Sequence, residues 1–412
     1  MHDWVVLWEW VEIAARWTHV ITAIAWIGSS FYFIALDLGL KKAAGMPALA
    51  HGEEWQVHGG GFYHITKYLV APDRLPEHLV WFKWESYATW LSGFVMLVLV
   101  YYLGAEMFLI DPTVMELDVW QAVAISVGSL AFGWLAYTTI CRIFVNANQT
   151  LVMIALFAVL VAMSWFYTQV FSGRAALLHL GAFTATIMSA NVFMIIIPNQ
   201  KIVVADLKAG RQPDPKYGKI AKQRSTHNNY LTLPVLFLML SNHYPLVFAT
   251  EHNWIIASLV FLMGVTIRHF FNSEHAGKGS PWWTWAVTAI LFLCIAWLST
   301  ASMRTLPEPE AKLQGAALQF AAADGFDDVV SIVQGRCSMC HAAEPVWDGL
   351  YWAPKGVVLE TDAQIAHEAR RIYLQAGISH AMPPGNLSYI EPEERAAIVQ
   401  WFRSAGKTGI EG

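Results

Sequence analysis

Eight stretches of largely apolar residues constrain this chain more than any other feature. Each approaches the roughly 20 residues that a helix needs to cross a lipid bilayer. The composition agrees, because 56% of the 412 residues are hydrophobic and only 14% are charged, whereas soluble domains carry about 25% charge. The predicted spans are 12–38, 79–104, 119–144, 150–171, 175–197, 228–246, 254–271 and 282–302. We therefore predict an all-α fold with an eight-helix transmembrane bundle over residues 1–303.

Charges between the predicted spans set the orientation of the bundle. The segment 199–226 contains seven Lys and Arg residues, and basic loops favour the cytoplasmic side. The segment 105–118 contains four acids and no base, so we expect it to face outward. With eight spans, both termini are predicted to lie in the periplasm, and the protein in a bacterial inner membrane with lipid around it. No Lys/Arg-rich run suggests a nucleic-acid partner.

The sequence CSMCH at 337–341 is typical of covalent attachment of haem c. Cys337 and Cys340 would bond to the porphyrin vinyl groups, which places His341 beneath the iron as a ligand. Downstream, HAMPPGN supplies Met382 as the predicted sixth ligand, in a loop stiffened by two prolines. Ligation by Met and His raises the haem potential and suits electron transfer. We predict a linker over 304–317 and a small periplasmic all-α cytochrome c domain over 318–412.

Two alternatives to this interpretation stay open. A C-x-x-C pair can also hold zinc or act as a redox dithiol, but zinc needs about four ligands and the sequence offers no second Cys/His pair. His380 lies two residues before Met382 and competes with it as the sixth ligand.

Histidines in the predicted spans raise the question of a second haem. His19 and Trp26 are seven residues apart and share a helix face. This H-x6-W-x-G pattern is similar to one in membrane families of copper resistance and of haem-dependent protoporphyrinogen oxidation. The resemblance to the latter family implies that this His is a haem ligand. We predict that His19 and His179 could hold haem b in the outer half of the bundle. The alternative is that both are hydrogen-bonded structural histidines. Without such a cofactor, electrons from a cytoplasmic-side substrate must cross about 30 Å, which is too far for one efficient transfer. Either an intermediate cofactor exists or the substrate binds close to the outer face.

The whole chain resembles a known architecture. The loop HGGGFYHITKY (58–68), the segment LVWFKWESYATWLSGFVMLVLVYY (79–102) and the C-terminal haem motif together resemble the bacterial membrane-bound urate oxidases that are fused to cytochrome c. The resemblance implies oxidation of urate to 5-hydroxyisourate in purine breakdown. Electrons would then pass to the fused haem and on to a downstream cytochrome c or a terminal oxidase.

Urate is a planar monoanion, so its site calls for Arg or Lys, for amides at its edges and for an aromatic ring on its face. A base must also take a proton as electrons leave. The predicted inner side offers such groups, and we take as catalytic candidates His58, His64, Glu85, Arg142 and Arg268. Lys67, Lys83 and Asn228 are further polar candidates, and Phe62 or Trp84 could stack on the substrate. Each basic residue has an alternative role, which is to hold its loop on the cytoplasmic side of the membrane by its positive charge.

Two rival functions follow from the same residues. The protein could be a non-enzymatic conduit that relays quinol electrons to cytochrome c, or a haem-pathway dehydrogenase as the first helix suggests. An anchor needs one helix and not eight, so the bundle and the polar loop after the first span favour a substrate site. A metal held by the inner histidines is a further open alternative.

Overall fold

The computed structural model describes residues 4–69, 72, 75–144, 149–301, 313, 315–350 and 352–408. The chain divides into two compact units. The bundle unit consists of Trp8–Asn242 and Leu246–Ser302. The C-terminal unit consists of Met303–Gly412 with the short segments Met1–Leu7 and His243–Pro245. The predicted linker over 304–317 falls mostly outside the described residues, and a helix already begins at Ala316.

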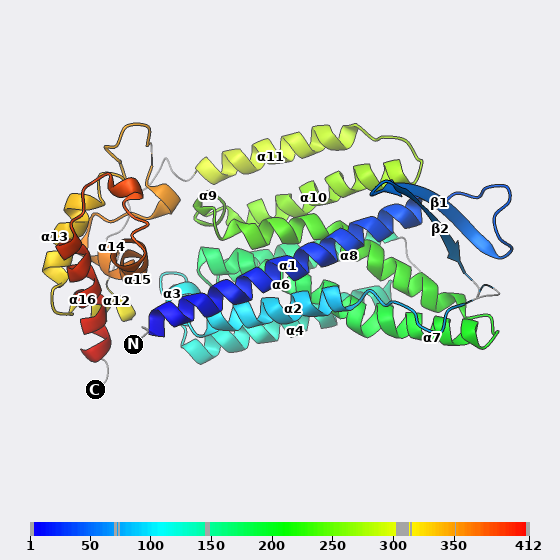
Figure 1. Cartoon of the computed structure of the whole chain (residues 1–412), viewed down its shortest axis with the longest axis horizontal. Coiled ribbons are helices and arrows are strands. Elements are labelled where there is room, and N and C mark those ends of the chain that lie inside the picture. The colour runs from blue at the N-terminus through cyan, green and yellow to red at the C-terminus, as the bar shows by residue number, and fades with distance from the viewer. Residues whose placement is uncertain are drawn as a thin grey trace. The chain divides into compact units, whose positions relative to one another are not determined.

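Long helices running side by side build the bundle unit (Figure 1). In chain order they are α1 (Trp4–Gly39), α2 (Trp84–Met96), α3 (Ala105–Phe108), α4 (Val119–Ile143), α5 (Gln149–Thr168), α6 (Gly173–Ala190), α7 (Ile197–Lys208), α8 (Pro215–Ser241), α9 (Pro245–Phe248), α10 (Asn253–His275) and α11 (Trp283–Ala301). Two π-helical turns continue α2 and α6 without a break. They are η1 (Leu97–Tyr102) and η2 (Asn191–Ile196).

Six helices or fused helices in the described residues are long and apolar enough to cross a membrane, which is compatible with a multi-pass membrane protein. They correspond to α1, α4, α5, α6 with its continuation to Lys208, α10 and α11. The other two predicted spans coincide with α2–η1 and with the second half of α8. The segment 199–226, expected as a cytoplasmic loop, is mostly helix, because α7 and α8 extend through it.

One part of the all-α prediction is wrong. The glycine-containing loop after α1 forms an antiparallel hairpin of β1 (Ala50–His58) and β2 (Gly61–Tyr68), with Val57 opposite Phe62. Gly59 and Gly60 form its turn with φ of 61° and 81°, a conformation that two-residue hairpin turns require and glycine adopts without strain. The glycines therefore shape a turn. Figure 1 shows the hairpin at the end of the bundle where α7 also lies.

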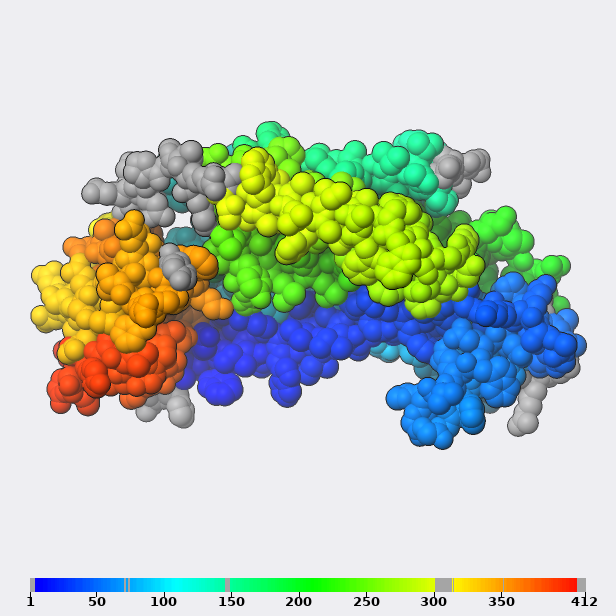
Figure 2. Space-filling model, turned by 90° about the horizontal axis from the view of Figure 1, so that it is seen from above, coloured from blue at the N-terminus to red at the C-terminus, as the bar shows by residue number. Residues whose placement is uncertain are grey.

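The periphery of the bundle unit is apolar. Figure 2 shows α1 lying along the outside of the bundle unit, and Leu36 is its one residue that is buried. Trp10, Trp17 and Ile24 on this helix are each at least 65% exposed. Such a surface is costly in water and favourable against lipid tails.

The core of the bundle unit lies between α4, α5, α6 and α8. Phe183, Tyr167 and Tyr137 are fully buried within it, together with Leu156 and Leu238. Close helix contact depends on glycine at two places. Gly133 lies directly beneath the Phe183 ring, and Gly264 of α10 faces Pro234, which interrupts the hydrogen bonding of α8.

We expect Gly264→Ala to destabilise the bundle unit. A Cβ at Gly264 would lie 2.5 Å from Cδ of Pro234, and the rigid ring cannot rotate away, so overpacking should cost about 1–3 kcal/mol. Gly128→Ala on α4 is the matched control, because a Cβ there meets nothing within 4 Å. That control should be neutral or stabilising by up to about 1 kcal/mol. Unfolding in detergent, followed by circular dichroism, measures both; equal stability of the two variants would contradict the packing described.

Short helices around a separate hydrophobic core form the C-terminal unit. They are α12 (Ala316–Ala321), α13 (Phe326–Arg336), η4 (Pro354–Gly356), α14 (Asp362–His367), α15 (Ala369–Ile372), η5 (Tyr373–Ile378), η6 (Pro384–Asn386) and α16 (Pro392–Thr408). Val329, Val333 and Ile398 are fully buried in this core, and Trp401 donates from its indole N–H to the carbonyl of Phe320 at 2.9 Å. Helices α13 and α16 are tied by the Arg336–Glu394 ion pair at 3.0 Å.

Candidate functional site

The CSMCH segment begins where α13 ends. Cys337 follows the last residue of α13, and its backbone N–H still donates to the carbonyl of Val333. The next turn brings the backbone N–H of both Cys340 and His341 to the carbonyl of Cys337, at 3.1 and 2.9 Å. Both cysteines are free thiols. A helix end followed by a tight turn thus holds two thiols and an imidazole in one short segment.

The state of the side chains in this segment suits the predicted haem ligands. His341 donates from Nδ1 to the carbonyl of Val357 at 2.9 Å, which orients the ring and leaves Nε2 as the available ligand atom. Burial raises the pKa of the Cys337 thiol to about 11. A redox-active C-x-x-C pair has a thiol of lowered pKa, so this environment does not favour the dithiol alternative. Within the described residues, no three His, Cys, Asp or Glu side chains gather as a metal site.

Met382 lies on a loop held by Arg395 of α16. The Met382 N–H donates to the carbonyl of Gln375 at 2.8 Å, and Arg395 donates to the carbonyl of Met382 at 3.0 Å and to the carbonyl of Ala376. Met382 and Cys337 both pack against the core of this unit. The competing ligand His380 has a positive φ of 54°. The structure thus fixes the backbone of the predicted sixth ligand.

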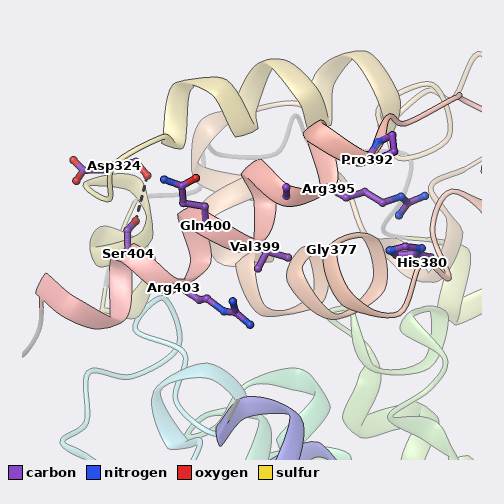
Figure 3. Close-up of a pocket in the computed structure, with 10 residues that line it drawn as sticks. Asp324, Gly377, His380, Pro392, Arg395, Val399, Gln400, Arg403 and Ser404 are labelled. Carbon is purple, nitrogen blue, oxygen red and sulfur yellow. Dashed lines mark hydrogen bonds between the residues drawn. The ribbon is translucent and has the colours of Figure 1, made fainter. Parts of the chain in front are cut away.

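A pocket of about 740 Å³ lies along α16 in the C-terminal unit (Figure 3). Figure 3 shows Arg395 and His380 at one end of it and Ser404, hydrogen-bonded to the carbonyl of Asp324, at the other. Its lining does not include Cys337, Cys340 or His341. The pocket therefore borders the Met382 loop and is distinct from the CSMCH segment.

The five predicted catalytic residues do not form one site. His58 and His64 lie exposed on the hairpin, where His64 pairs with Glu53 at 2.8 Å and stacks on Trp55. Glu85 is half-buried in the first turn of α2, and Arg142 is exposed in the last turn of α4. No hydrogen bond or ion pair joins any two of the five in the described part of the chain. Arg268 alone is buried among other polar groups.

His19 and His179 do not meet either. His19 is half-buried, with Nδ1 3.0 Å from the carbonyl oxygen of Thr89 on α2. His179 is fully buried; Nδ1 donates to the carbonyl of Ala175, Ser126 lies 2.8 Å from Nε2, and the ring packs on Tyr101. The two histidines thus contact α2 and η1 at different points, His19 at Thr89 and His179 at Tyr101. These two points are twelve residues apart on one continuous helical segment, which separates them by about 15–18 Å along the helix axis. This arrangement resembles two hydrogen-bonded structural histidines more than one haem b site. The prediction that His19 and His179 hold haem b stays untested.

A different set of polar residues is buried inside the bundle unit, and we call it the Arg224 cluster. Arg224 and His227, three apart on α8, face Tyr137 of α4; the Tyr137 hydroxyl lies 2.8 Å from Nδ1 of His227. The Arg224 guanidinium lies over the Tyr137 ring, 4.6 Å from its centroid. Asn191 of η2 donates to the Tyr137 hydroxyl at 3.2 Å and to Asn228 Oδ1 at 2.9 Å. All five side chains are at most 5% exposed.

Two nitrogen atoms of the Arg224 cluster have no hydrogen-bond partner. Six buried side-chain atoms in the described part of the chain have no hydrogen-bond partner, and three of them belong to α8: Arg224 Nε, His227 Nε2 and Asn229 Nδ2. Arg224 forms no ion pair with a carboxylate among the described residues; it interacts with the Tyr137 hydroxyl and donates to Asn191 Oδ1 at 3.5 Å. Burying an unpaired cation costs several kcal/mol, and the cation–π contact returns about 2 kcal/mol.

A second buried arginine lies on the other side of α8. Arg268 of α10 donates to Asn229 Oδ1 at 3.3 Å and to Asn272 Oδ1 at 3.0 Å. Its guanidinium also lies 4.2 Å from the centroid of the Phe31 ring. Asn229 follows His227 by two residues and therefore points to a different side of α8. Arg268, which bonds to Asn229, and the Arg224 cluster thus lie on different sides of this helix. Arg268 differs from Arg224 because two amide oxygens accept its hydrogens.

A comparison with protein-family models adds a decisive observation. The model described as "Urate oxidase N-terminal" matches residues 5–299, which include every helix of the bundle unit that contributes to the Arg224 cluster. The chain belongs to the urate oxidase N-terminal family. Neither curated proteins nor solved structures give a significant match. Membership in the urate oxidase N-terminal family supports a urate-related oxidoreductase, and the resemblance stated from the sequence is confirmed to that extent.

Sequence reasoning missed most of the Arg224 cluster. Arg224 was counted among the seven basic residues of a cytoplasmic loop, and Tyr137 and Asn191 looked like ordinary residues of apolar spans. One signal was present: HNNY at 227–230 places three consecutive polar side chains near the start of a predicted span, and polar groups inside membrane helices are costly enough to indicate function.

Proposed function

We propose that the protein oxidises urate to 5-hydroxyisourate in a membrane and passes the electrons to a c-type haem in its own C-terminal unit. The observation that carries the proposal is that the family region and the haem-attachment motif belong to the same chain. In a single chain, the urate oxidase N-terminal region ends at residue 299, and Cys337, Cys340 and His341 follow. Haem c is an electron carrier, so its attachment to this family region supplies an electron acceptor.

The reaction balances with this acceptor. Urate monoanion and water give 5-hydroxyisourate, one proton and two electrons. When bound, the haem would accept these electrons one at a time, with reoxidation between them by a downstream cytochrome c or a terminal oxidase. The residues present fit the group: two free thiols, an imidazole whose Nδ1 is already engaged, and a methionine on a fixed loop. We further propose the inner membrane of a bacterium as the location, with both termini in the periplasm.

The test is reduction of the haem by the substrate itself. Urate added anaerobically to the oxidised, haem-loaded protein should produce the reduced α-band within the turnover time. A control without urate should stay oxidised. Reduction by a quinol but not by urate would instead support the electron conduit, and failure with both would refute the relay. A pyridine haemochrome spectrum on the same sample distinguishes haem c from any haem b.

A further inference from the structure

We infer that the Arg224 cluster binds the urate anion, with Arg224 pairing with its charge and His227 taking its proton. This inference rests on the proposed function and assigns its substrate site. The ligand class is a planar, anionic, oxo-substituted purine. Of the residues in this site the sequence predicted only Asn228 as a candidate; Arg224, Tyr137 and Asn191 were not among its candidates.

The need for an anion follows from Arg224. Arg224 is 4% exposed and has no carboxylate partner in the described residues, and its Nε makes no hydrogen bond. Guanidinium is always charged and presents a planar fork of donors that matches two acceptors side by side. An oxo-purine anion offers such pairs of acceptors at its edge. The Tyr137 ring below the guanidinium keeps it in place.

The amides beside Arg224 suit the polar edge of a purine. Asn191 and Asn228 are bonded to each other, and Asn228 also donates to the carbonyl of Met188 at 2.9 Å. Each amide oxygen has a second lone pair that can accept from a ring N–H. Asn191 is also the first residue of η2, and isolated π-helical turns are frequent at functional sites.

His227 is placed to act as a base. The Tyr137 hydroxyl accepts from Asn191 and lies 2.8 Å from Nδ1 of His227, and either of these two atoms can donate to the other. When Nδ1 carries the ring proton, Nε2 is unprotonated, and Nε2 is a buried atom without a partner. A ring N–H of urate can therefore give its proton to Nε2 as the electrons leave. Arg224 and His227 are three apart on α8, so both act on one side of the helix.

The experiment measures urate binding and urate-dependent haem reduction in full-length, haem-loaded protein. Arg224→Gln should raise the Kd for urate about 10- to 100-fold. Arg224→Lys keeps the charge but not the fork and should recover part of the affinity. Lys222→Gln is the matched control, because it removes one positive charge from an exposed position two residues away on the same helix. It should bind urate as the unchanged protein does.

A second measurement separates ligand binding from a structural role. Because Arg224 is buried without an anion, Arg224→Gln should leave the thermal stability of the urate-free protein unchanged or higher. A structural arginine would lower it. Added urate should raise the stability of the unchanged protein and not of the variant.

Three outcomes decide the inference. If urate neither binds to the unchanged protein nor reduces its haem, the proposed function fails, and the substrate assignment fails with it. If the unchanged protein oxidises urate and Arg224→Gln does so equally well, the proposed function stands and the site is wrong. If Arg268→Gln abolishes binding while Arg224→Gln does not, the substrate lies on the other side of α8.

Discussion

A chain in which Cys337 and Cys340 are both replaced by alanine will carry no covalent haem and will pass no electrons from urate to an external acceptor. The two thiols are the only atoms of CSMCH that can form thioethers, and the imidazole of His341 alone cannot retain the group through denaturation. Urate binding should persist, because the Arg224 cluster belongs to the bundle unit and shares no residue with this segment. We therefore expect complete loss of turnover with an unchanged Kd.

The measurement pairs haem staining of the denatured chain with urate binding to the detergent-solubilised protein. Cys294→Ala is the matched control, since Cys294 is an exposed thiol on α11 and should leave haem content and turnover unchanged. Urate oxidation at the normal rate by the double variant, with the physiological acceptor, would show that electrons do not leave through this unit.

Hydrophobic length was sufficient to predict the long apolar helices, because a segment such as 119–144 has no other way to bury its backbone in lipid. It did not predict α7 or the first half of α8, which are polar. The same reasoning failed at residues 50–68. That segment is polar, and its strands are specified by the Gly59–Gly60 turn and by cross-strand pairs such as Trp55 with His64. The sequence analysis treated this segment as a loop and overlooked the hairpin that two such residues favour.

The candidate site was harder to predict for a geometric reason. Arg224 and Arg142 are both basic residues near the inner ends of predicted spans. The sequence analysis placed Arg224 in a loop, although Asp214 and Pro215 are a typical helix start from which α8 carries Arg224 into the bundle. Arg142 is exposed and Arg224 is buried. Only the packing of α8 against α4 and η2 shows which arginine lacks a partner. The CSMCH motif was easier, because its residues are adjacent in the chain.

Replacing His227 with glutamine should lower urate turnover by about 100-fold or more while changing the Kd for urate little. Glutamine retains the size of the side chain and can still hydrogen-bond to Tyr137, but it cannot accept a proton at neutral pH. Loss of a general base typically costs about 10²- to 10⁴-fold in rate. The rate of haem reduction at saturating urate, measured anaerobically by stopped flow, reports this step without the downstream oxidase.

Tyr137→Phe completes the argument about the base. Phenylalanine keeps the ring beneath Arg224 and removes only the hydroxyl that orients His227 through Nδ1, so we expect a loss of about 10-fold in rate, smaller than that of His227→Gln. His275→Gln, at an exposed histidine in the last turn of α10, should leave the rate unchanged. A normal rate for His227→Gln would mean that another group takes the proton. Loss of urate binding in that variant, with turnover intact at saturation, would make His227 a binding residue and not a base.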